Sequence, residues 1–347
     1  MKTIFTTMLK AARKVRRRTL KVSLALPRIP APLKIIFKPV RNVSNVATRL
    51  TSTSKSLHAE LGAEKLPVPG TSVERLFSYR KQKLAYRLYV PVSAQSSDMP
   101  LLMMLHGCGQ SADNFAAGTR MNTCADERGM LVVYPQQSSS ANVGRCWNWH
   151  RPVDQKRGSG EPALLAALTR HLIASCKADA RRVYIAGLSA GACAAAITAA
   201  AYPELYKAVG VHSGLARGDI ETLQGALSAM RHGSKATTIQ AGSRTVRTIV
   251  FHGDEDRIVH PSNAEGFLAL AQQASSHPFQ RDVEQGHQNS RDFTRSLYKN
   301  KAGVVMLENW TIHGGGHMWS GGSASGAYAD PAGPDASSEM VRFFLDA

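Results

Sequence analysis

The chain has 347 residues, 43% of them hydrophobic, which is enough for one large α/β domain or two small ones with a sizeable core. Its formal net charge of +18 would suggest a nucleic-acid or anionic membrane partner, but fourteen Lys and Arg and no Asp or Glu lie in residues 1–59. The remaining 29 basic and 25 acidic residues nearly balance, so the basicity belongs to a tail and nucleic acid is not favoured as a partner.

The five cysteines are odd in number and form no Cys-x-x-Cys pair, so neither a zinc site nor a full disulfide framework is indicated. We expect no bound metal. No run of eighteen apolar residues exists, which excludes a membrane-spanning helix from the sequence pattern.

Residues 1–25 have the pattern of a basic amphipathic helix that binds a surface, with a disordered basic tail as the alternative. Prolines and a Ser/Thr-rich stretch follow, which predicts a poorly ordered extension over residues 1–65 and a catalytic domain over 66–347. Basic residues interrupt any apolar signal segment, and Arg16-Arg17-Arg18 only loosely matches a twin-arginine signal. A cytoplasmic or granule-associated location is therefore favoured.

Beyond residue 70, apolar runs alternate with helical patterns. The predicted strands are Leu84–Val90, Leu101–Leu105, Met130–Tyr134, Val183–Ala186, Ala208–Val211, Thr248–Phe251 and Val304–Leu307. The predicted helices are 113–128, Pro162–Cys176, Ala192–Ala201, 262–274 and 336–346. This alternation predicts a mostly parallel sheet with helices on both faces, in which ligands bind beyond the carboxyl ends of the strands.

The most informative stretch is Gly187-Leu188-Ser189-Ala190-Gly191, which lies between a predicted strand and a run of small residues typical of a packed helix. That context predicts a sharp strand-to-helix turn that exposes Ser189 above the sheet as a nucleophile. An ordinary Gly-rich loop capped by a serine is the alternative interpretation.

A serine nucleophile needs an imidazole to take its proton and a carboxylate to orient that imidazole. We favour Asp256 over Asp254 as the carboxylate and His317 over His313 as the base, because a loop after each strand can deliver these residues to a cleft. The order Ser, Asp, His is the order found on α/β-hydrolase sheets. The other histidines, including His212 and His287, we expect at the surface or the core edge.

Acyl transfer also needs donors for the developing oxyanion. We predict the backbone N–H groups of Ala190 and Cys108, the latter in the Gly-rich turn after Leu105, with a simple strand-to-helix turn as the alternative. Gln110 is a candidate substrate contact in the same turn. Tryptophans in loops can line an acyl or polymer groove, or else cover the core. The candidates for the groove are Trp147, Trp149 and Trp319.

Taken together, these motifs resemble the poly(3-hydroxybutyrate) depolymerase family of esterases, which is similar to feruloyl and acetylxylan esterases. The resemblance covers roughly residues 80–345. Its motifs are His106-Gly107-Cys108-Gly109-Gln110, Asn114–Thr119, Cys146-Trp147-Asn148-Trp149, Gly160-Glu161-Pro162, Gly187–Gly191, His212-Ser213-Gly214, His252–Asp256 and Gly316–Gly322.

The resemblance implies an α/β-hydrolase fold and serine esterase chemistry without a metal or organic cofactor. It supports Ser189, Asp256 and His317 as a triad and the Cys108 region as the oxyanion loop. It also makes Cys108 and Cys146 a candidate disulfide pair. Many members of the family are extracellular, in contrast to the location favoured above.

Three functions follow as expectations. The first is hydrolysis of poly(3-hydroxybutyrate) or short-chain 3-hydroxyalkanoate oligomers, and the second is hydrolysis of feruloyl or acetyl groups on polysaccharide. The third belongs to another class: a protein whose residues 1–40 bind a polymer granule or an anionic membrane surface.

Overall fold

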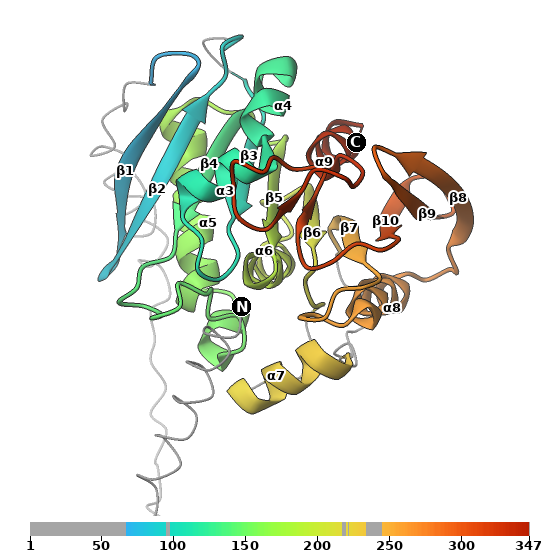
Figure 1. Cartoon of the computed structure of the whole chain (residues 1–347). Coiled ribbons are helices and arrows are strands. Elements are labelled where there is room, and N and C mark those ends of the chain that lie inside the picture. The colour runs from blue at the N-terminus through green and yellow to red at the C-terminus, as the bar shows by residue number, and fades with distance from the viewer. Residues whose placement is uncertain (1–66, 95–97, 217–219, 221, 234–244, 347) are drawn as a thin grey trace, which may run out of the picture. The chain divides into compact units, whose positions relative to one another are not determined.

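The computed structural model describes residues 67–94, 98–216, 220, 222–233 and 245–346, all of which lie in the unit Lys65–Ala347 (Figure 1). The extension predicted for residues 1–65, and with it the surface-binding role of residues 1–40, lies outside the described residues. The domain boundary therefore stays a prediction.

One ten-stranded sheet runs through the described unit in the order β1-β2-β4-β3-β5-β6-β7-β10-β9-β8. Its strands are β1 (Thr71–Tyr79), β2 (Gln82–Val90), β3 (Leu101–Leu105), β4 (Leu131–Gln136), β5 (Val183–Leu188), β6 (Ala208–His212), β7 (Arg247–Gly253), β8 (Gln280–Gln288), β9 (Arg291–Lys299) and β10 (Val305–Ile312). The strands from β4 to β10 in this order pair in parallel, whereas β1 with β2 and β8 with β9 add antiparallel strands at the two edges (Figure 1).

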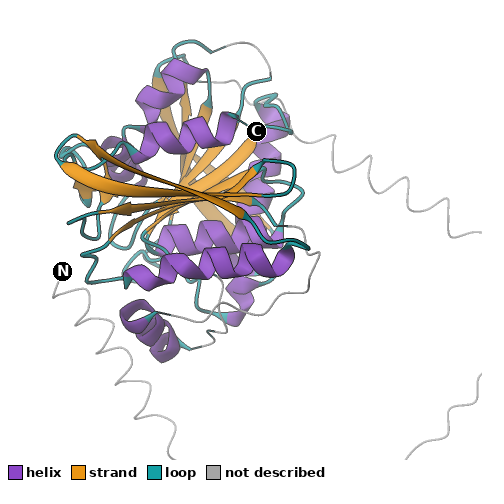
Figure 2. Cartoon of the chain, turned by 90° about the vertical axis from the view of Figure 1, so that its right-hand side faces the viewer, coloured by secondary structure: helices purple, strands orange, loops and turns teal. Residues whose placement is uncertain are grey.

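Helices cover both faces of the sheet (Figure 2). They are α3 (Ala112–Thr119), α4 (Met121–Arg128), α5 (Gly160–Ser175), α6 (Ala190–Ala201), α7 (Leu223–His232), α8 (Glu265–Ala274) and α9 (Ala336–Leu345), with 3₁₀ turns η1 (Pro152–Gln155) and η2 (Pro261–Ala264). A short parallel pair, β11 (Trp319–Ser320) and β12 (Ala329–Asp330), stands apart from the main sheet.

The predicted strands are all present, and the mostly parallel sheet with helices on both faces is confirmed. The helix predicted over residues 113–128 is instead two helices, because Arg120 adopts φ +53° and ends the first one. Four further elements, β1, β8, β9 and α7, were not predicted from the sequence. Most side chains of these elements are exposed or half-buried, so the elements lack the buried apolar runs that revealed the central strands.

All five residues of β3 and all six of β5 are buried, as expected for parallel strands covered on both faces. Because β3, β5, β7 and β10 run in the same direction, their carboxyl ends meet at one edge of the sheet. Ser189 follows β5, Asp256 lies in the loop after β7, and His317 lies in the loop after β10. The fold thus brings residues more than a hundred positions apart to the same edge.

Candidate active site

Ser189 occupies a strained turn between β5 and α6. Its backbone has φ +58° and ψ −120°, a conformation that costs a residue with a side chain roughly 1–3 kcal/mol. Its N–H donates to the His212 carbonyl at 2.9 Å, which ties the turn to the end of β6. This is the geometry expected of a serine whose hydroxyl is presented above the sheet.

Two glycines allow this turn to lie against the end of β3. A Cβ added at Gly191 would lie 2.1 Å from the Leu105 carbonyl oxygen and 2.5 Å from that of His106. A Cβ at Gly187 would lie 2.5 Å from the backbone of Gly191. Only glycine permits such an approach, so both residues are needed to bring the chain after β3 beside Ser189.

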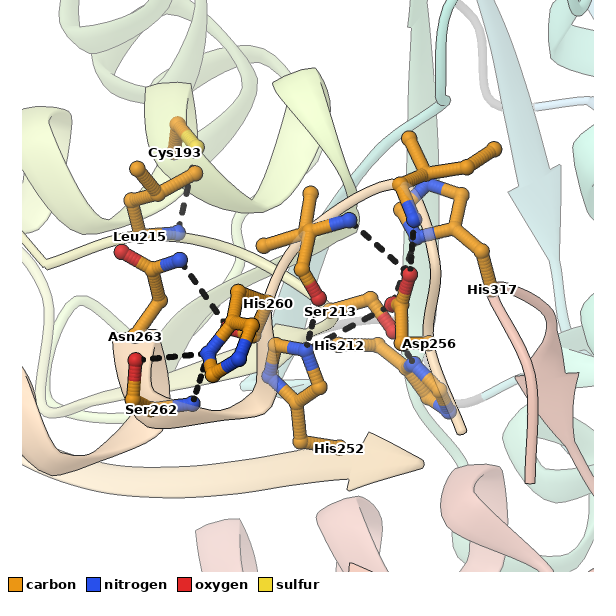
Figure 3. Close-up of polar contacts among 12 residues, drawn as sticks. Cys193, His212, Ser213, Leu215, His252, Asp256, His260, Ser262, Asn263 and His317 are labelled. Atoms are coloured by element: carbon orange, nitrogen blue, oxygen red, sulfur yellow. Dashed lines mark hydrogen bonds and ion pairs between the residues drawn. The ribbon is translucent and has the colours of Figure 1, made fainter. Parts of the chain in front are cut away.

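Asp256 and His317 form a buried pair in the structure. The Asp256 Oδ2 atom lies 2.7 Å from Nδ1 of His317 and 3.4 Å from Nε2 of His252, and Figure 3 shows this cluster. The other carboxylate oxygen accepts the N–H groups of Ile258 and Val259, each at 2.9 Å. Because Nδ1 faces the carboxylate, Nε2 is the nitrogen of His317 that remains to accept a proton.

Burial of the Asp256 carboxyl by itself would raise its pKa. The hydrogen bonds from His252 and His317, the charge of His317 and the Val259 N–H outweigh burial, and the pKa of Asp256 lies well below its ordinary value. The group is therefore a carboxylate at every pH at which the protein is expected to work. That charge is what stabilises a protonated imidazole beside it.

Asp254 and His313, the alternatives to Asp256 and His317, form a separate pair. Asp254 Oδ2 is 2.8 Å from Nδ1 of His313, and its Oδ1 accepts the Gly314 N–H at 2.8 Å. The Nε2 atom of His313 lies 2.9 Å from the Thr294 hydroxyl, so both ring nitrogens of His313 have partners. The side chains of both residues are about two-fifths exposed, at 43% for His313 and 38% for Asp254. Asp254 therefore holds the loop that leads to His317.

The candidate oxyanion donors lie on either side of Ser189. We use the name oxyanion loop for residues 106–110, which follow β3. Among the hydrogen bonds of the described residues, none uses the N–H of Cys108 or of Ala190, so both remain available to a ligand. Cys108 is bonded to Cys146 in a disulfide, and the Gly109 N–H donates to the Gly144 carbonyl at 2.9 Å. The segment before Trp147 thus fixes the position of the oxyanion loop.

Three of the candidate substrate contacts lie in the interior. The Gln110 side chain accepts the Gly107 N–H at 2.8 Å and donates to the Ala327 carbonyl at 2.8 Å. Trp147 and Trp319 are each 1% exposed, and their ring N–H groups donate to the His106 carbonyl and the Ser337 hydroxyl. These side chains are part of the packed interior, so the expectation of an open tryptophan-lined groove holds for neither ring.

Trp149 borders a small cavity. The cavity measures about 10 Å³ and lies one helical turn beyond Ser189, beside Cys193. Its other lining residues are Gln155, Ile197, Leu215, Ala216 and Ile220.

His212 was predicted at the surface or the core edge, but it lies in the interior. It is fully buried at the end of β6, stacks on Trp319 with ring centroids 5.2 Å apart, and accepts the Ser320 N–H at 3.0 Å. Burial first, and then the charges of His252 and His317, lower its pKa to about 3. It is therefore a neutral acceptor that holds the segment after His317, a role signalled only by its place at a strand end. His287, by contrast, is exposed as predicted.

The described residues include no helix of sufficient length and apolar character to cross a membrane. In the same part of the chain, no three His, Cys, Asp or Glu side chains gather in a way that could hold a metal ion.

Comparison with known proteins gives a family match over residues 84–277, described as "Esterase PHB depolymerase". Poly(3-hydroxyalkanoate) depolymerase C of Paucimonas lemoignei is 28% identical over 240 residues, which cover 66% of this chain and 57% of that protein. Feruloyl esterase B of Neurospora crassa is 28% identical over 255 residues, which cover 67% of this chain and 85% of that protein. The chain thus matches little more than half of the depolymerase.

Among solved structures, the acetyl xylan esterase from Aspergillus awamori superimposes with a TM-score of 0.61 at 20% identity. The match covers 80% of this chain and all of that one. It shows that the sheet and its helices form an α/β-hydrolase fold, as the sequence resemblance implied.

Proposed function

This chain belongs to the esterase PHB depolymerase family and is a carboxylic ester hydrolase, and on that premise we propose that Ser189, His317 and Asp256 are its catalytic triad. The observation that carries the proposal is the 2.7 Å contact between Asp256 and Nδ1 of His317, at the sheet edge where Ser189 is held in its strained turn. The family match explains why such a constellation would be present.

In the proposed mechanism, Nε2 of His317 takes the proton of the Ser189 hydroxyl as the oxygen attacks the ester carbonyl. The N–H groups of Ala190 and Cys108 donate to the oxyanion that forms. The alcohol then leaves with the proton from His317, which produces an acyl-enzyme. A water molecule gives a proton to His317 and attacks the acyl group, and collapse of this second oxyanion returns the proton to Ser189 and releases the acid.

The test is the burst of p-nitrophenol released from p-nitrophenyl butyrate, which reports formation of the acyl-enzyme. We expect Ser189→Ala to abolish the burst and to lower kcat by about 10⁶-fold. His317→Ala and the double variant should be nearly as damaged, because triad members act as a unit. Full activity in Ser189→Ala would overturn the proposal.

For the substrate, we favour esters of short 3-hydroxyalkanoic acids, as polymer or as oligomers. The relative named as a poly(3-hydroxyalkanoate) depolymerase supports this class.

A second candidate substrate is a feruloyl or acetyl ester on a polysaccharide, which the similarity to the Neurospora feruloyl esterase and the Aspergillus acetyl xylan esterase favours. Rates measured side by side on hydroxybutyrate oligomers, acetylated xylan and methyl ferulate separate the candidates, with Ser189→Ala as the control. Faster turnover of methyl ferulate than of the oligomers would reject the preferred class.

We also keep the proposal that residues 1–40 bind a polymer granule or an anionic membrane. Its support is the charge pattern, since residues 1–59 hold fourteen cations and no carboxylate. Replacing the tail cations by Gln should reduce co-sedimentation with phosphatidylserine vesicles or polymer granules and leave soluble-ester activity intact. Unchanged sedimentation would reject this role.

A further inference from the structure

Glu161 is a buried carboxylate to which the mechanism above assigns no task. It lies in the first turn of α5 and is 8% exposed. Among the ion pairs of the residues that the structure describes, none involves Glu161. Burying a carboxylate without a cation is costly, so the protein must compensate with hydrogen bonds.

Three N–H donors supply that compensation, and all come from the loops around the candidate site. Oε1 of Glu161 accepts the side-chain amides of Gln137 at 2.6 Å and Asn148 at 2.7 Å. Oε2 accepts the backbone N–H of Asn148 at 2.8 Å. Every partner is a donor, so both oxygens act as acceptors, as in the ionised carboxylate, and an added O–H proton would find no acceptor among these three partners.

Residues 146–149, which we call the tryptophan loop, connect Glu161 to the oxyanion loop. Asn148 is the centre of the tryptophan loop, and the Gln137 amide also donates to the Cys146 carbonyl at 3.2 Å. Cys146 is covalently bonded to Cys108, and the Trp147 ring N–H donates to the His106 carbonyl at 3.2 Å. The position of the Cys108 N–H therefore depends on the tryptophan loop, which Glu161 binds through Asn148.

The charged and titratable groups around Glu161 are few. Asp154 in η1 accepts the Glu161 N–H at 2.8 Å, and burial raises the pKa of Asp154 too. His106 accepts the Gln137 N–H, but burial lowers its pKa to about 4, so it is neutral near pH 7. Burial, followed by the charge of Asp154, raises the pKa of Glu161 to about 7, against the opposing effect of its hydrogen bonds from Asn148 and Gln137.

We propose that Glu161 is a positioning residue for the oxyanion loop, and that its ionised form holds the Cys108 amide in place while its protonated form releases the tryptophan loop. This rests on the proposed function, because it assumes that the Cys108 N–H binds the oxyanion. A protonated carboxyl would turn one accepted hydrogen bond into a donor-to-donor contact. The loop must then move to relieve that contact.

The first test compares Glu161→Gln with the wild type and with the exposed control Glu127→Gln, using p-nitrophenyl butyrate from pH 5 to 9. The amide copies the shape of the protonated carboxyl and cannot ionise. We expect kcat to fall about 10²-fold with KM nearly unchanged, as for the loss of one oxyanion donor. Protonation of His317 inactivates every variant at acid pH, so we expect the acid limb of the wild type and of Glu127→Gln to be steeper than that of Glu161→Gln, by the one further proton that Glu161 binds. Unchanged kcat, or an equally steep acid limb in Glu161→Gln and the wild type, would overturn the proposal.

A second measurement is independent of catalysis. Trp147 and Trp149 flank Asn148, so their fluorescence should report release of the tryptophan loop. In the full chain carrying Ser189→Ala, we expect tryptophan emission to change with a midpoint near pH 7, and we expect Glu161→Gln to remove that change. Absence of any such transition in Ser189→Ala would overturn the proposal even if Glu161→Gln failed to fold. Failure of the triad itself would appear separately, as activity that survives Ser189→Ala.

Discussion

The carboxylate of Asp256 contacts both the loop that carries it and two histidines of the candidate site. One oxygen binds two backbone N–H groups of its own loop, and the other faces the rings of His317 and His252. The backbone bonds keep the carboxylate rotamer fixed, so the imidazole is oriented by a group that cannot turn away. Position and charge are therefore separable contributions, and a substitution that keeps one and removes the other can measure them.

Asp256→Asn keeps the volume of the side chain and removes its charge. Its amide must either face the Nδ1–H of His317 with a donor or force the wrong tautomer, so we expect kcat to fall about 10⁴-fold with little change in KM. Asp254→Asn is the matched control, because Asp254 holds the same loop through His313 and Gly314 without facing His317. Steady-state kinetics on p-nitrophenyl butyrate give kcat and KM for both variants. A larger loss in Asp254→Asn would reverse the assignment of the two carboxylates.

At the scale of elements, the site depends on the contact between the end of β3 and the turn that joins β5 to α6. Leu105 and His106 approach the backbone of Gly187 and Gly191 more closely than any side chain would allow. The same contact brings the oxyanion loop beside Ser189. The same two glycines thus permit both the packing of the turn against β3 and the geometry of the candidate site.

Gly191→Ala should therefore damage both the packing of the turn against β3 and the geometry of the candidate site. Its Cβ would meet two backbone carbonyl oxygens, and we expect a loss of about 1–3 kcal/mol in the free energy of unfolding together with a fall in kcat.

The control is Gly225→Ala in α7, where the nearest heavy atom to an added Cβ is the Thr222 hydroxyl at 3.2 Å. There we expect a change near zero or a gain of about 0.5–1 kcal/mol, because alanine favours a helix. Urea unfolding of both variants measures the difference. Equal stability of the two would contradict the close-contact argument.

The elements differ in how well the sequence predicts them, and the cause is burial. Runs such as Leu101–Leu105 are apolar throughout because both faces of a parallel strand are covered, so they are visible without a structure. In β8 no residue is buried, and its polar sequence resembles a loop. The order of Ser189, Asp256 and His317 along the chain was also visible. The tasks of His212 and Glu161 were not, because they arise from hydrogen bonds to residues far away in the sequence or across a loop.

For the whole molecule, two buried carboxylates make stability depend on pH in opposite directions. The pKa of Glu161 is raised from 4.5 to about 7, so its contribution to stability is fully present below pH 4.5 and is lost as pH rises through 7. The pKa of Asp256 is lowered, so its contribution is present above its ordinary pKa of 3.8 and is lost at more acid pH. We therefore expect a stability maximum on the acid side of neutrality.

Melting temperatures of the wild type and Glu161→Gln from pH 5 to 8 test this expectation. The wild type should lose up to about 3 kcal/mol relative to the variant as pH rises over that range, which is the raised pKa converted to free energy. A difference between the two proteins that does not change with pH would show that Glu161 does not titrate in the folded state.

The central claim is that Ser189 is the nucleophile of an ester hydrolase and that His317 activates it. The most direct measurement is covalent labelling of the full chain with a p-nitrophenyl alkylphosphonate, followed by mass spectrometry of its peptides. The account predicts one adduct on Ser189, loss of hydrolysis in proportion to labelling, and very slow labelling in His317→Ala. An adduct on another residue, or hydrolysis that persists when Ser189 is fully labelled, would contradict it.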